Sequence, residues 1–422
     1  MNRKISLGIA IGIAALAAAI TFIVTYNYAM SVFNATVKSV TEKEESYTKL
    51  AEMDQYVRAN YVNEFDEAHL MNCIMEGYIS GLGDEYAEYF SPEEYTALLS
   101  AEEGVTVGLG ITYEKEASGY IKILSVNEGS SAAELKLVPG DIITAVNNTD
   151  VIAFDGGYDE AVTLLECAEG TKVKLHIKRA NIEGVSEFFA VDLVSRKMEM
   201  VSVSSVLMND VGYIKISTFN GRTPDQFKNA VNSMLEQGAR SLVFDIRENS
   251  SGVMGSLESC LDYIIGDCDA VTAKFKDREE VVVRTTEADK ISMPMAVIIN
   301  GNTASAAELF ALALRDEAGA HIVGVQSKGN GIMQYTHKLS GGAAVKVSVA
   351  VLSTSVTGEF DGVGVKPDFE AVIPDGEVLV LDHNAFYGQD TQLEKALEVV
   401  KPVQELSDET EAAVAQENIG ES

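Results

Sequence analysis

The first pattern in the chain is a continuous apolar run. Residues Ile5 to Val24, ISLGIAIGIAALAAAITFIV, carry no charge over twenty positions, about the length that an α-helix needs to cross a membrane. Arg3 and Lys4 precede the run. Because positive residues stay on the cytoplasmic side, the pattern predicts an uncleaved anchor, with the chain beyond about Tyr26 outside the cytoplasm. A cleaved signal peptide is the alternative, but its apolar core usually spans only about 7 to 15 residues.

Helical spacing returns after this run. Within residues 38–62, Leu50, Met53 and Val57 recur at helical spacing among charged residues, which predicts an amphipathic helix that packs on a neighbour or on a second copy of the chain. Further on, Ser91-Pro92-Glu93-Glu94 is typical of a helix start, with proline at the first helical position and acids in the first turn. We therefore expect a stub, anchor and linker over residues 1–37 and a helical region over residues 38–103.

From Gly104 the chain changes to short β-branched runs broken by glycine, asparagine and proline. Such runs predict strands, and the stretches between them predict two short helices. The strands are VTVGLGITYE, YIKILSVN, DIITAVN, TKVKLHIKR and FFAVDLVS, and the helices are SSAAELK and DEAVTLLE. The pattern indicates a small β-rich domain over residues 104–196.

Strand and helix patterns alternate over residues 197–398, which is typical of a sheet covered by helices and predicts an α/β, multidomain chain. The predicted strands are 212–217, 241–247, 296–300, 321–325, 333–339 and 344–354, and the predicted helices are 224–238, the stretch through LESCLDYII, and AAELFALALRDEAG. At two points a strand leads into a polar loop, ENSSG or GNTAS, and then into a helix. Backbone amides and the positive helix end can stabilise an anion at such points.

Length and charge then limit the class of protein. The chain has 422 residues, which favours two to four domains of about 100 to 200 residues each. It carries 32 basic and 64 acidic residues, a net charge of −32, and a field of this sign repels phosphate backbones. Nucleic acid is therefore excluded as a partner. Residues 399–422 are acidic with few large apolar residues, so we expect a solvated tail.

The cysteines and acidic residues do not indicate a metal site. Cys73, Cys167, Cys260 and Cys268 contain no C-x-x-C pair, so neither a structural zinc site nor a disulfide scaffold is expected. We expect them to be small buried apolar residues. No cluster of His, Asp or Glu has the spacing of metal ligands, so we expect no metal and no organic cofactor.

The loop Gly108-Leu109-Gly110-Ile111 is a candidate binding site in the β-rich domain. Its backbone N–H groups could converge into a nest for a carboxylate, although a lone G-x-G is more simply a tight turn. Combined with LKLVPGDIITAVNN over residues 135–148, the loop makes the domain resemble a PDZ domain. The resemblance implies that an extended peptide adds to a sheet edge and that its free C-terminal carboxylate binds at this loop.

Ser305 is a candidate nucleophile because it stands in GNTASAAE, directly before a predicted helix. Small neighbours leave its hydroxyl exposed, and the helix terminus favours developing negative charge. Taken alone, however, this signal favours an ordinary helix N-cap, since serine, threonine and asparagine are common at that position.

The order of several motifs is more specific than any one of them. The chain carries GLGDEYAEYFSPEEY, the PDZ-like domain, VGYIKISTFNG, LVFDIRENSSG, NGNTASAAELFALALRDE, VGVQSKGNGIMQ and FDGVGVKPDFE. This succession resembles the carboxy-terminal processing peptidases, which are tail-specific serine endopeptidases with a Ser-Lys dyad. The resemblance implies a crotonase-like peptidase core of βαβ units over residues 197–398, with the PDZ domain inserted between the N-terminal helices and the core.

The resemblance also implies site residues. The family's nucleophile falls on Ser305, and the backbone N–H of Ala306 falls on one oxyanion donor. The second donor belongs to a Gly-Gly turn, where this chain has Ser251 and Gly252; if that turn needs a positive φ, a serine at position 251 is strained. The family's glutamine, which orients the base, is Gln334.

The family's general-base lysine is absent, because its position in a G-K-G turn is occupied by Asn330. An amide cannot accept the serine proton, and removing one member of such a unit typically lowers turnover by about 10⁴ to 10⁶. Lys328 is a candidate substitute base if the loop is shifted, since it lies two residues earlier. His321 and His337 are weaker candidates, because histidines at such positions are usually surface or core residues.

Two functions follow. The first is a membrane-anchored extracytoplasmic protein whose PDZ domain captures polypeptide C-termini and presents them to a serine endopeptidase site at Ser305. The second is an inactive pseudopeptidase that binds tails or regulates a partner peptidase. A crotonase-like acyl-CoA enzyme would share the fold but would explain neither the PDZ domain nor export. The expected partners are polypeptides with free C-termini, the membrane and, through the N-terminal helices, a second copy of the chain.

Overall fold

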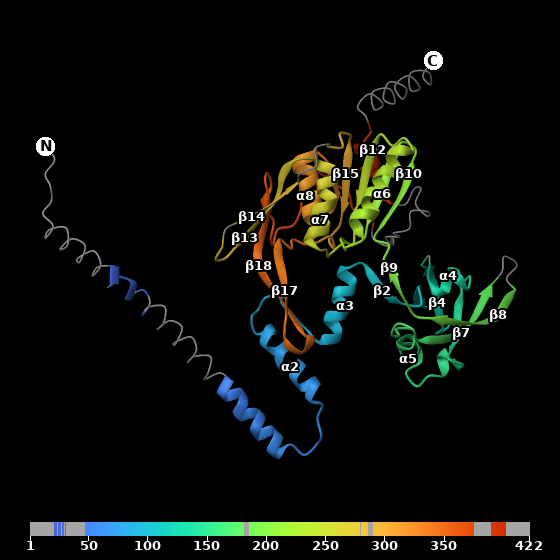
Figure 1. Ribbon diagram of the computed structural model, residues 1–422. Helices are drawn as coiled ribbons and strands as arrows, with labels where there is room; N and C mark the ends of the chain where they lie inside the picture. The colour runs from blue at the N-terminus through green and yellow to red at the C-terminus, as the bar shows by residue number, and fades with distance from the viewer. Residues whose placement is uncertain are drawn as a thin grey trace, which may run out of the picture. The chain divides into compact units, whose positions relative to one another are not determined.

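The computed structural model describes residues 47–127, 129–180, 185–278, 280–285, 290–374 and 390–401, together with 21, 22, 24–26, 28 and 30 (Figure 1). Within these residues no helix has the length and apolar character that crossing a membrane requires. Most of the predicted anchor, Ile5–Val24, and the predicted acidic tail beyond residue 401 lie outside the described residues. The chain divides into two compact units, Met1–Ile74 and Met75–Ser422.

The first unit contains the predicted amphipathic helix, which is described over 47–60, and the start of α2 (Glu67–Ser80). Arg58 connects the two helices: its Nε donates to Asp54 Oδ2 at 2.7 Å and its Nη2 donates to Glu67 Oε2 at 2.9 Å. Met53 and Tyr56 are 57% and 71% exposed. The packing of this helix on a second copy of the chain stays a prediction.

Strand β1 (Glu88–Phe90) and helix α3 (Pro92–Glu102) lie in the second unit, and the helix begins where the sequence predicts. Ser91 and Glu94 form a capping box, because Ser91 Oγ accepts from Glu94 N at 3.3 Å and Glu94 accepts from Ser91 N at 2.8 Å. Pro92 occupies the first helical position, which needs no N–H donor.

The β-rich domain contains all five predicted strand regions and both predicted helices. The main sheet is antiparallel in the order β3-β4-β5-β7-β8, with β6 on β5, and a separate ribbon pairs β2 with β9. Alternate strand residues such as Ile121, Ile123, Leu175 and Ile177 point into one core and are completely buried. The elements are β2 (Val105–Gly108), β3 (Ile111–Lys115), β4 (Ile121–Val126), α4 (Ser131–Glu134), β5 (Ile142–Val146), β6 (Thr149–Asp150), η1 (Val151–Ala153), α5 (Gly157–Thr163), β7 (Lys172–Ala180), β8 (Ser186–Val194) and β9 (Arg196–Glu199).

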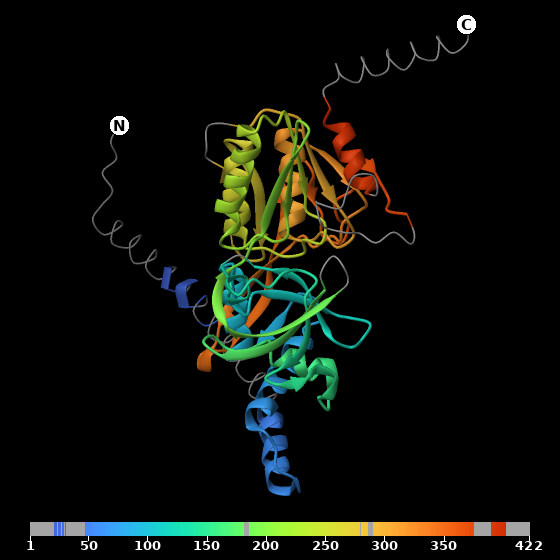
Figure 2. The same cartoon turned by 90° about the vertical axis from the view of Figure 1, so that its right-hand side faces the viewer.

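A six-stranded sheet forms the centre of the following α/β region, in the order β10-β11-β12-β15-β16-β20. All neighbours from β11 onward are parallel. Helices α6, α7 and α8 contribute to the core on one face and α9 to the core on the other (Figure 2). The elements are β10 (Val203–Met208), β11 (Val211–Ile216), α6 (Thr223–Glu236), β12 (Ser241–Asp245), α7 (Met254–Ile265), β15 (Met295–Ile299), α8 (Ala306–Ala318), β16 (His321–Gly324), β20 (Phe369–Glu370) and α9 (Thr391–Val399).

A second, antiparallel sheet follows the path β1-β18-β13-β14, and β17 and β19 also pair with β18. Its strands are β13 (Cys268–Phe275), β14 (Val281–Thr285), β17 (Ile332–Lys338), β18 (Ala344–Thr354) and β19 (Gly358–Glu359), and η2 (Ser340–Gly342) joins β17 to β18. The sequence predicted β17 and β18 but not β1, β13 or β14. This sheet matters for the site, because it brings residues near position 88 beside residues near position 346.

The cysteines differ from the expectation. All four are free, but only Cys260 is fully buried, and burial raises the pKa of its thiol to about 12. Cys167 and Cys268 are half-buried, and Cys73 is exposed with its Sγ 3.8 Å from His69 Nε2. The prediction of four small buried residues is therefore wrong for three of them.

Candidate active site

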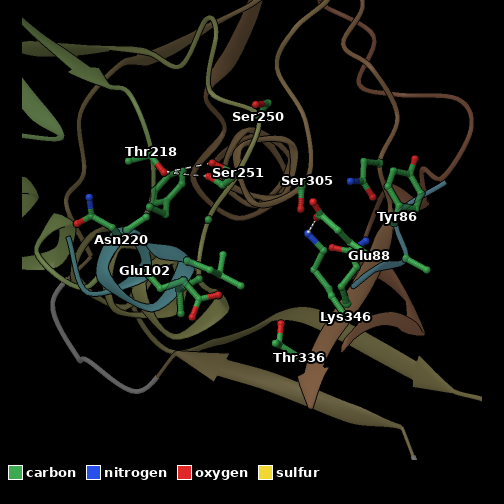
Figure 3. Close-up of a pocket in the computed structure, with 18 of the residues that line it drawn as sticks. Tyr86, Glu88, Glu102, Thr218, Asn220, Ser250, Ser251, Ser305, Thr336 and Lys346 are labelled. Atoms are coloured by element: carbon green, nitrogen blue, oxygen red, sulfur yellow. Dashed lines mark hydrogen bonds and ion pairs between the residues drawn. The ribbon is translucent and has the colours of Figure 1, made fainter. Parts of the chain in front are cut away.

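A cavity of about 670 Å³ collects most of the predicted catalytic residues (Figure 3). Ser305, Asn330, Gln334, Ser251 and Gly252 all line it, although they come from three separate stretches of the chain. The loop after β12 supplies the 251–252 pair, the loop after β15 supplies Ser305, and the turn before β17 and the start of β17 supply Asn330 and Gln334. Parallel strands β12 and β15 are neighbours, so the loops at their carboxyl ends meet at one edge of the sheet.

Ser305 has an unusual backbone conformation, with φ 57° and ψ −119°. An ordinary N-cap lies in the extended region, whereas a non-glycine residue with positive φ is strained by about 1 to 3 kcal/mol. Its side chain is half-buried in the wall of the cavity, directly before α8. This geometry favours the interpretation of Ser305 as a nucleophile over that of a simple helix cap, because strained turns of this kind expose a serine hydroxyl to the substrate.

The buried carboxylate of Glu308 binds both the backbone at Ser305 and the turn around Asn330. It lies in the first turn of α8 and is completely buried. One oxygen accepts from Ser305 N at 2.8 Å and from Asn330 N at 2.9 Å, and the other accepts from Gly329 N at 2.7 Å and from Ser327 Oγ. Glu308 therefore fixes the turn around position 330 beside Ser305, and its own charge is stabilised by donors and by the helix N-terminus.

The glycines on either side of Asn330 allow this turn to pack closely. Gly329 has φ +89°, and a Cβ there would lie 2.7 Å from Gly364 N. A Cβ at Gly331 would lie 2.7 Å from Asp361 N, and Gly331 N donates to Asp361 Oδ1 at 3.1 Å. The turn is therefore held on both sides, and the orientation of residue 330 is fixed whatever its side chain.

Asn330 is 9% exposed and its side-chain carbonyl accepts weakly from Ile332 N at 3.3 Å. Gln334 faces the same cavity from β17 and donates from Nε2 to Ile332 O at 2.8 Å. Residue 330 therefore lies where the general base is expected, but its side chain has no basic atom.

The second oxyanion position is well packed. A Cβ at Gly252 would lie 2.9 Å from Ala306 Cβ and 2.7 Å from Phe219 Cβ, so a glycine is required where this loop packs against the Ala306 side chain. The strain expected at Ser251 is absent, because Ser251 is not a positive-φ residue; in this loop that conformation belongs to Glu248, with φ 62°. Asn300 and Asn302 donate to the Glu248 carboxylate and hold it there.

The structure places the proposed substitute bases outside the cavity. Lys328 is exposed and its backbone N donates to Thr303 O at 3.0 Å, but it does not line the cavity. His337 is exposed on β17, where Gln334 and Thr336 face the cavity and alternate residues face away. His321 begins β16 and pairs with Ala296, toward the opposite end of the sheet from the site loops. None of the three therefore lies at Ser305.

Several residues of the cavity were not predicted as site residues, namely Tyr86, Glu88, Glu102, Thr218, Thr336 and Lys346. Burial raises the pKa of Tyr86, with Glu85 contributing to the same effect. The motif GLGDEYAEYFSPEEY contained Tyr86 and Glu88, but nothing in that motif indicated which of its residues face Ser305. In Figure 3, Ser305 lies between Ser251 on one side and the Glu88–Lys346 pair on the other.

A second cavity, of about 540 Å³, lies along the predicted carboxylate loop of the β-rich domain. Gly108, Leu109, Gly110 and Ile111 all line it, and Leu165 and Met198 add apolar walls. Gly110 has φ +82°, and a Cβ there would overlap the Ser130 side chain. Glycine is therefore required at this turn, which leaves the loop backbone open to a ligand.

Comparison with known proteins gives concordant results. Residues 210–371 match the profile of peptidase family S41, and residues 122–179 match the profile of the PDZ domain. The carboxy-terminal processing protease CtpA of Bacillus subtilis (strain 168) is 27% identical over 381 residues, which cover 89% of this chain and 79% of that protein. A protein of Staphylococcus aureus (strain COL) named "Probable CtpA-like serine protease" is 27% identical over 373 residues, 87% of this chain and 72% of that protein.

One solved structure supports the fold. It is an S41-family protein from Bacteroides fragilis NCTC 9343, with a TM-score of 0.52 and 15% sequence identity. The similarity covers 81% of this chain and 90% of the other. It supports a mixed α/β fold.

The Glu308 network makes a stability prediction. Replacing Glu308 by Gln removes the charge and turns one acceptor oxygen into a donor that faces backbone N–H groups, so we expect a loss of about 2 to 4 kcal/mol in the free energy of unfolding. Urea denaturation followed by circular dichroism measures the loss, and hydrogen exchange should show faster exchange at the amides of Gly329 and Asn330. Glu236→Gln, on the exposed face of α6, is the matched control; equal stability and equal protection in the two variants would contradict the role of Glu308.

Proposed function

The chain belongs to the carboxy-terminal processing peptidases, and on that premise we propose that it captures polypeptide C-termini through its PDZ domain and cleaves them slowly at Ser305. One observation carries the proposal: a strained, half-buried serine lies in a cavity beside the backbone of Ala306 and Gly252, with Gln334 in the same cavity. In this assignment Ser305 attacks the peptide carbonyl, and the two backbone N–H groups stabilise the oxyanion.

The rate is limited by position 330. A serine hydroxyl needs a neighbouring base, and Asn330 offers only an amide. The rest of the site supports catalysis, because Glu308 holds the turn in place and Ser251 is unstrained. We therefore propose that the chain keeps the peptidase scaffold but lacks the amine at its usual position.

We expect Asn330→Lys to raise Ser305-dependent cleavage of casein by about 10² to 10⁴, the usual contribution of a general base. The substitution places an amine in the cavity on a turn whose backbone is already fixed by Glu308. Initial rates of casein hydrolysis by the full chain measure the effect, with Ser305→Ala as the blank.

Asn330→Met is the matched control for that experiment, because methionine has a similar length and flexibility but no amine. It should stay at the level of the unaltered chain. Adding Ser251→Gly to Asn330→Lys should bring no further gain, since position 251 is not in the left-handed region. If Asn330→Lys does not exceed Asn330→Met, the assignment of position 330 is wrong.

The PDZ domain is the proposed receptor for the tail. An added peptide strand would place its carboxylate at the loop Gly108–Ile111 and its last side chain against Leu109, Leu165 and Met198. These walls are apolar, so the proposed clients end in an apolar residue.

We expect a peptide with a free C-terminal acid to bind at least about tenfold more tightly than the same peptide with a C-terminal amide, because hydrogen bonds to a charged acceptor are the stronger ones. Calorimetry with the Ser305→Ala chain measures both affinities. Gly110→Ala should abolish the difference, since its Cβ overlaps Ser130. Gly170→Ala is the control, because Gly170 has the same φ of +82° with open space around it; equal binding of acid and amide would refute carboxylate capture.

We also propose that Ile5–Val24 anchors the chain and that the remainder acts outside the cytoplasm, on the basis of the uncharged run that follows Arg3 and Lys4. Protease added to spheroplasts should then degrade the chain beyond the anchor while cytoplasmic marker proteins stay intact. Full protection of the chain, or a mature N-terminus after Ala19 or Tyr28, would contradict the uncleaved anchor.

A pseudopeptidase remains the second candidate function, and the amide at Asn330 favours it. In that case the cavity holds a tail without cutting it. Ser305-dependent cleavage by the unaltered chain separates the two candidates, because only the peptidase shows it.

A further inference from the structure

Lys346 is the one basic residue among those that line the Ser305 cavity in the described part of the chain. The cavity otherwise contains the carboxylates of Glu85, Glu88 and Glu102 and a set of neutral side chains. Lys346 lies in none of the motifs that carry the family resemblance, and the proposed function gives it no role. An amine in this cavity is notable, because an amine is the group that position 330 lacks.

The strand register places Lys346 on the same face as Gln334. Lys346 on β18 pairs directly with Thr336 on β17 and with Glu88 on β1, and direct partners in a sheet point to one face. Gln334 is two residues from Thr336 and therefore points the same way. Diagonal neighbours of this kind lie about 7 to 8 Å apart, which the four-carbon stem of a lysine can span.

The side chain of Lys346 is held at the cavity by Glu88. Its Nζ lies 2.8 Å from Glu88 Oε2 and 5.0 Å from the centre of the Phe90 ring. The side chain is 28% exposed and that of Glu88 is 54% exposed, so the pair is accessible to water and can exchange. Figure 3 shows both side chains pointing toward the wall that carries Ser305.

We propose that Lys346 supplies the missing amine and acts as the general base toward Ser305, an inference that rests on the proposed peptidase function. As the bond forms between Ser305 Oγ and the peptide carbonyl carbon, the hydroxyl proton passes to the neutral Nζ of Lys346. As the C–N bond breaks, the same proton passes to the leaving amine. Water then hydrolyses the acyl-enzyme, with Nζ accepting a proton from the water and returning it to Ser305.

The charges around Lys346 dictate how the activity depends on pH. Glu88 on β1 and Glu102 on α3 are the carboxylates that face the Lys346 amine. The facing partner on β17, Thr336, carries no charge. Because only the neutral form of an amine accepts a proton, a general base at this position predicts a rate that increases with pH between pH 6.5 and pH 9.5.

The test measures Ser305-dependent hydrolysis of p-nitrophenyl acetate and of casein by the full chain between pH 6.5 and pH 9.5, after subtraction of Ser305→Ala at each pH. Lys346→Met should abolish the alkaline increase, and Lys346→Arg should abolish it too, because a guanidinium keeps the charge but does not deprotonate. Glu88→Gln should raise the rate at pH 8 by about two- to fivefold, the usual effect of removing an exposed ion pair. Lys338→Met, at the exposed end of β17 and outside the cavity, should change nothing.

Asn330→Lys distinguishes a catalytic role from a structural one. With an amine restored at position 330, adding Lys346→Met should leave most of the activity; loss of activity in both backgrounds would show a structural role and overturn the inference. Full activity of Lys346→Arg would also overturn it, in favour of a purely electrostatic role. If the unaltered chain shows a Ser305-dependent rate and Lys346→Met shows the same rate at every pH, the inference fails while the proposed function stands. If the unaltered chain shows no Ser305-dependent rate even at pH 9.5, both fail.

Discussion

The candidate site depends on one buried carboxylate. Glu308 accepts hydrogen bonds from Ser305, Ser327, Gly329 and Asn330, and so joins the start of α8 to a turn more than twenty residues away. A buried charge without these donors would be very costly, and the donors without the charge would be left unsatisfied. Each side of the site therefore requires the other, which explains how a strained serine can be maintained in a solvent-facing cavity.

The same network fixes the backbone of residue 330 independently of its side chain. Glu308 binds the backbone N–H of Asn330, and the glycines on either side pack against residues 361–364, so neither interaction involves the side chain. A lysine can therefore be replaced by asparagine at this position without disturbing the turn. The backbone of the site is therefore compatible with loss of the amine at position 330.

Sequence patterns predicted the parts of the molecule that local physics controls. The helix start at Ser91-Pro92, the buried strand around Phe244 and the helix after Ser305 all appear where the patterns place them. The pairing of β1 with β18 was not predictable, because it joins Glu88 to Lys346 across 258 residues and follows from no local pattern. The absence of strain at Ser251 was also not predictable. The residue with positive φ in this loop is Glu248, and its carboxylate accepts hydrogen bonds from two asparagines that are distant in sequence.

The ribbon that leads to the loop Gly108–Ile111 also contacts the Ser305 cavity. Strand β2 begins after Gly104 and ends at Gly108, the first residue of the loop. A Cβ at Gly104 would overlap Asn220, which lines the Ser305 cavity, and Gly221 N donates to Glu102 O at 2.7 Å. A strand of only four residues therefore separates the loop from a residue that packs on the cavity wall. Because close-packed backbone leaves little room for independent movement, this short connection constrains where the β-rich domain can attach beside the cavity.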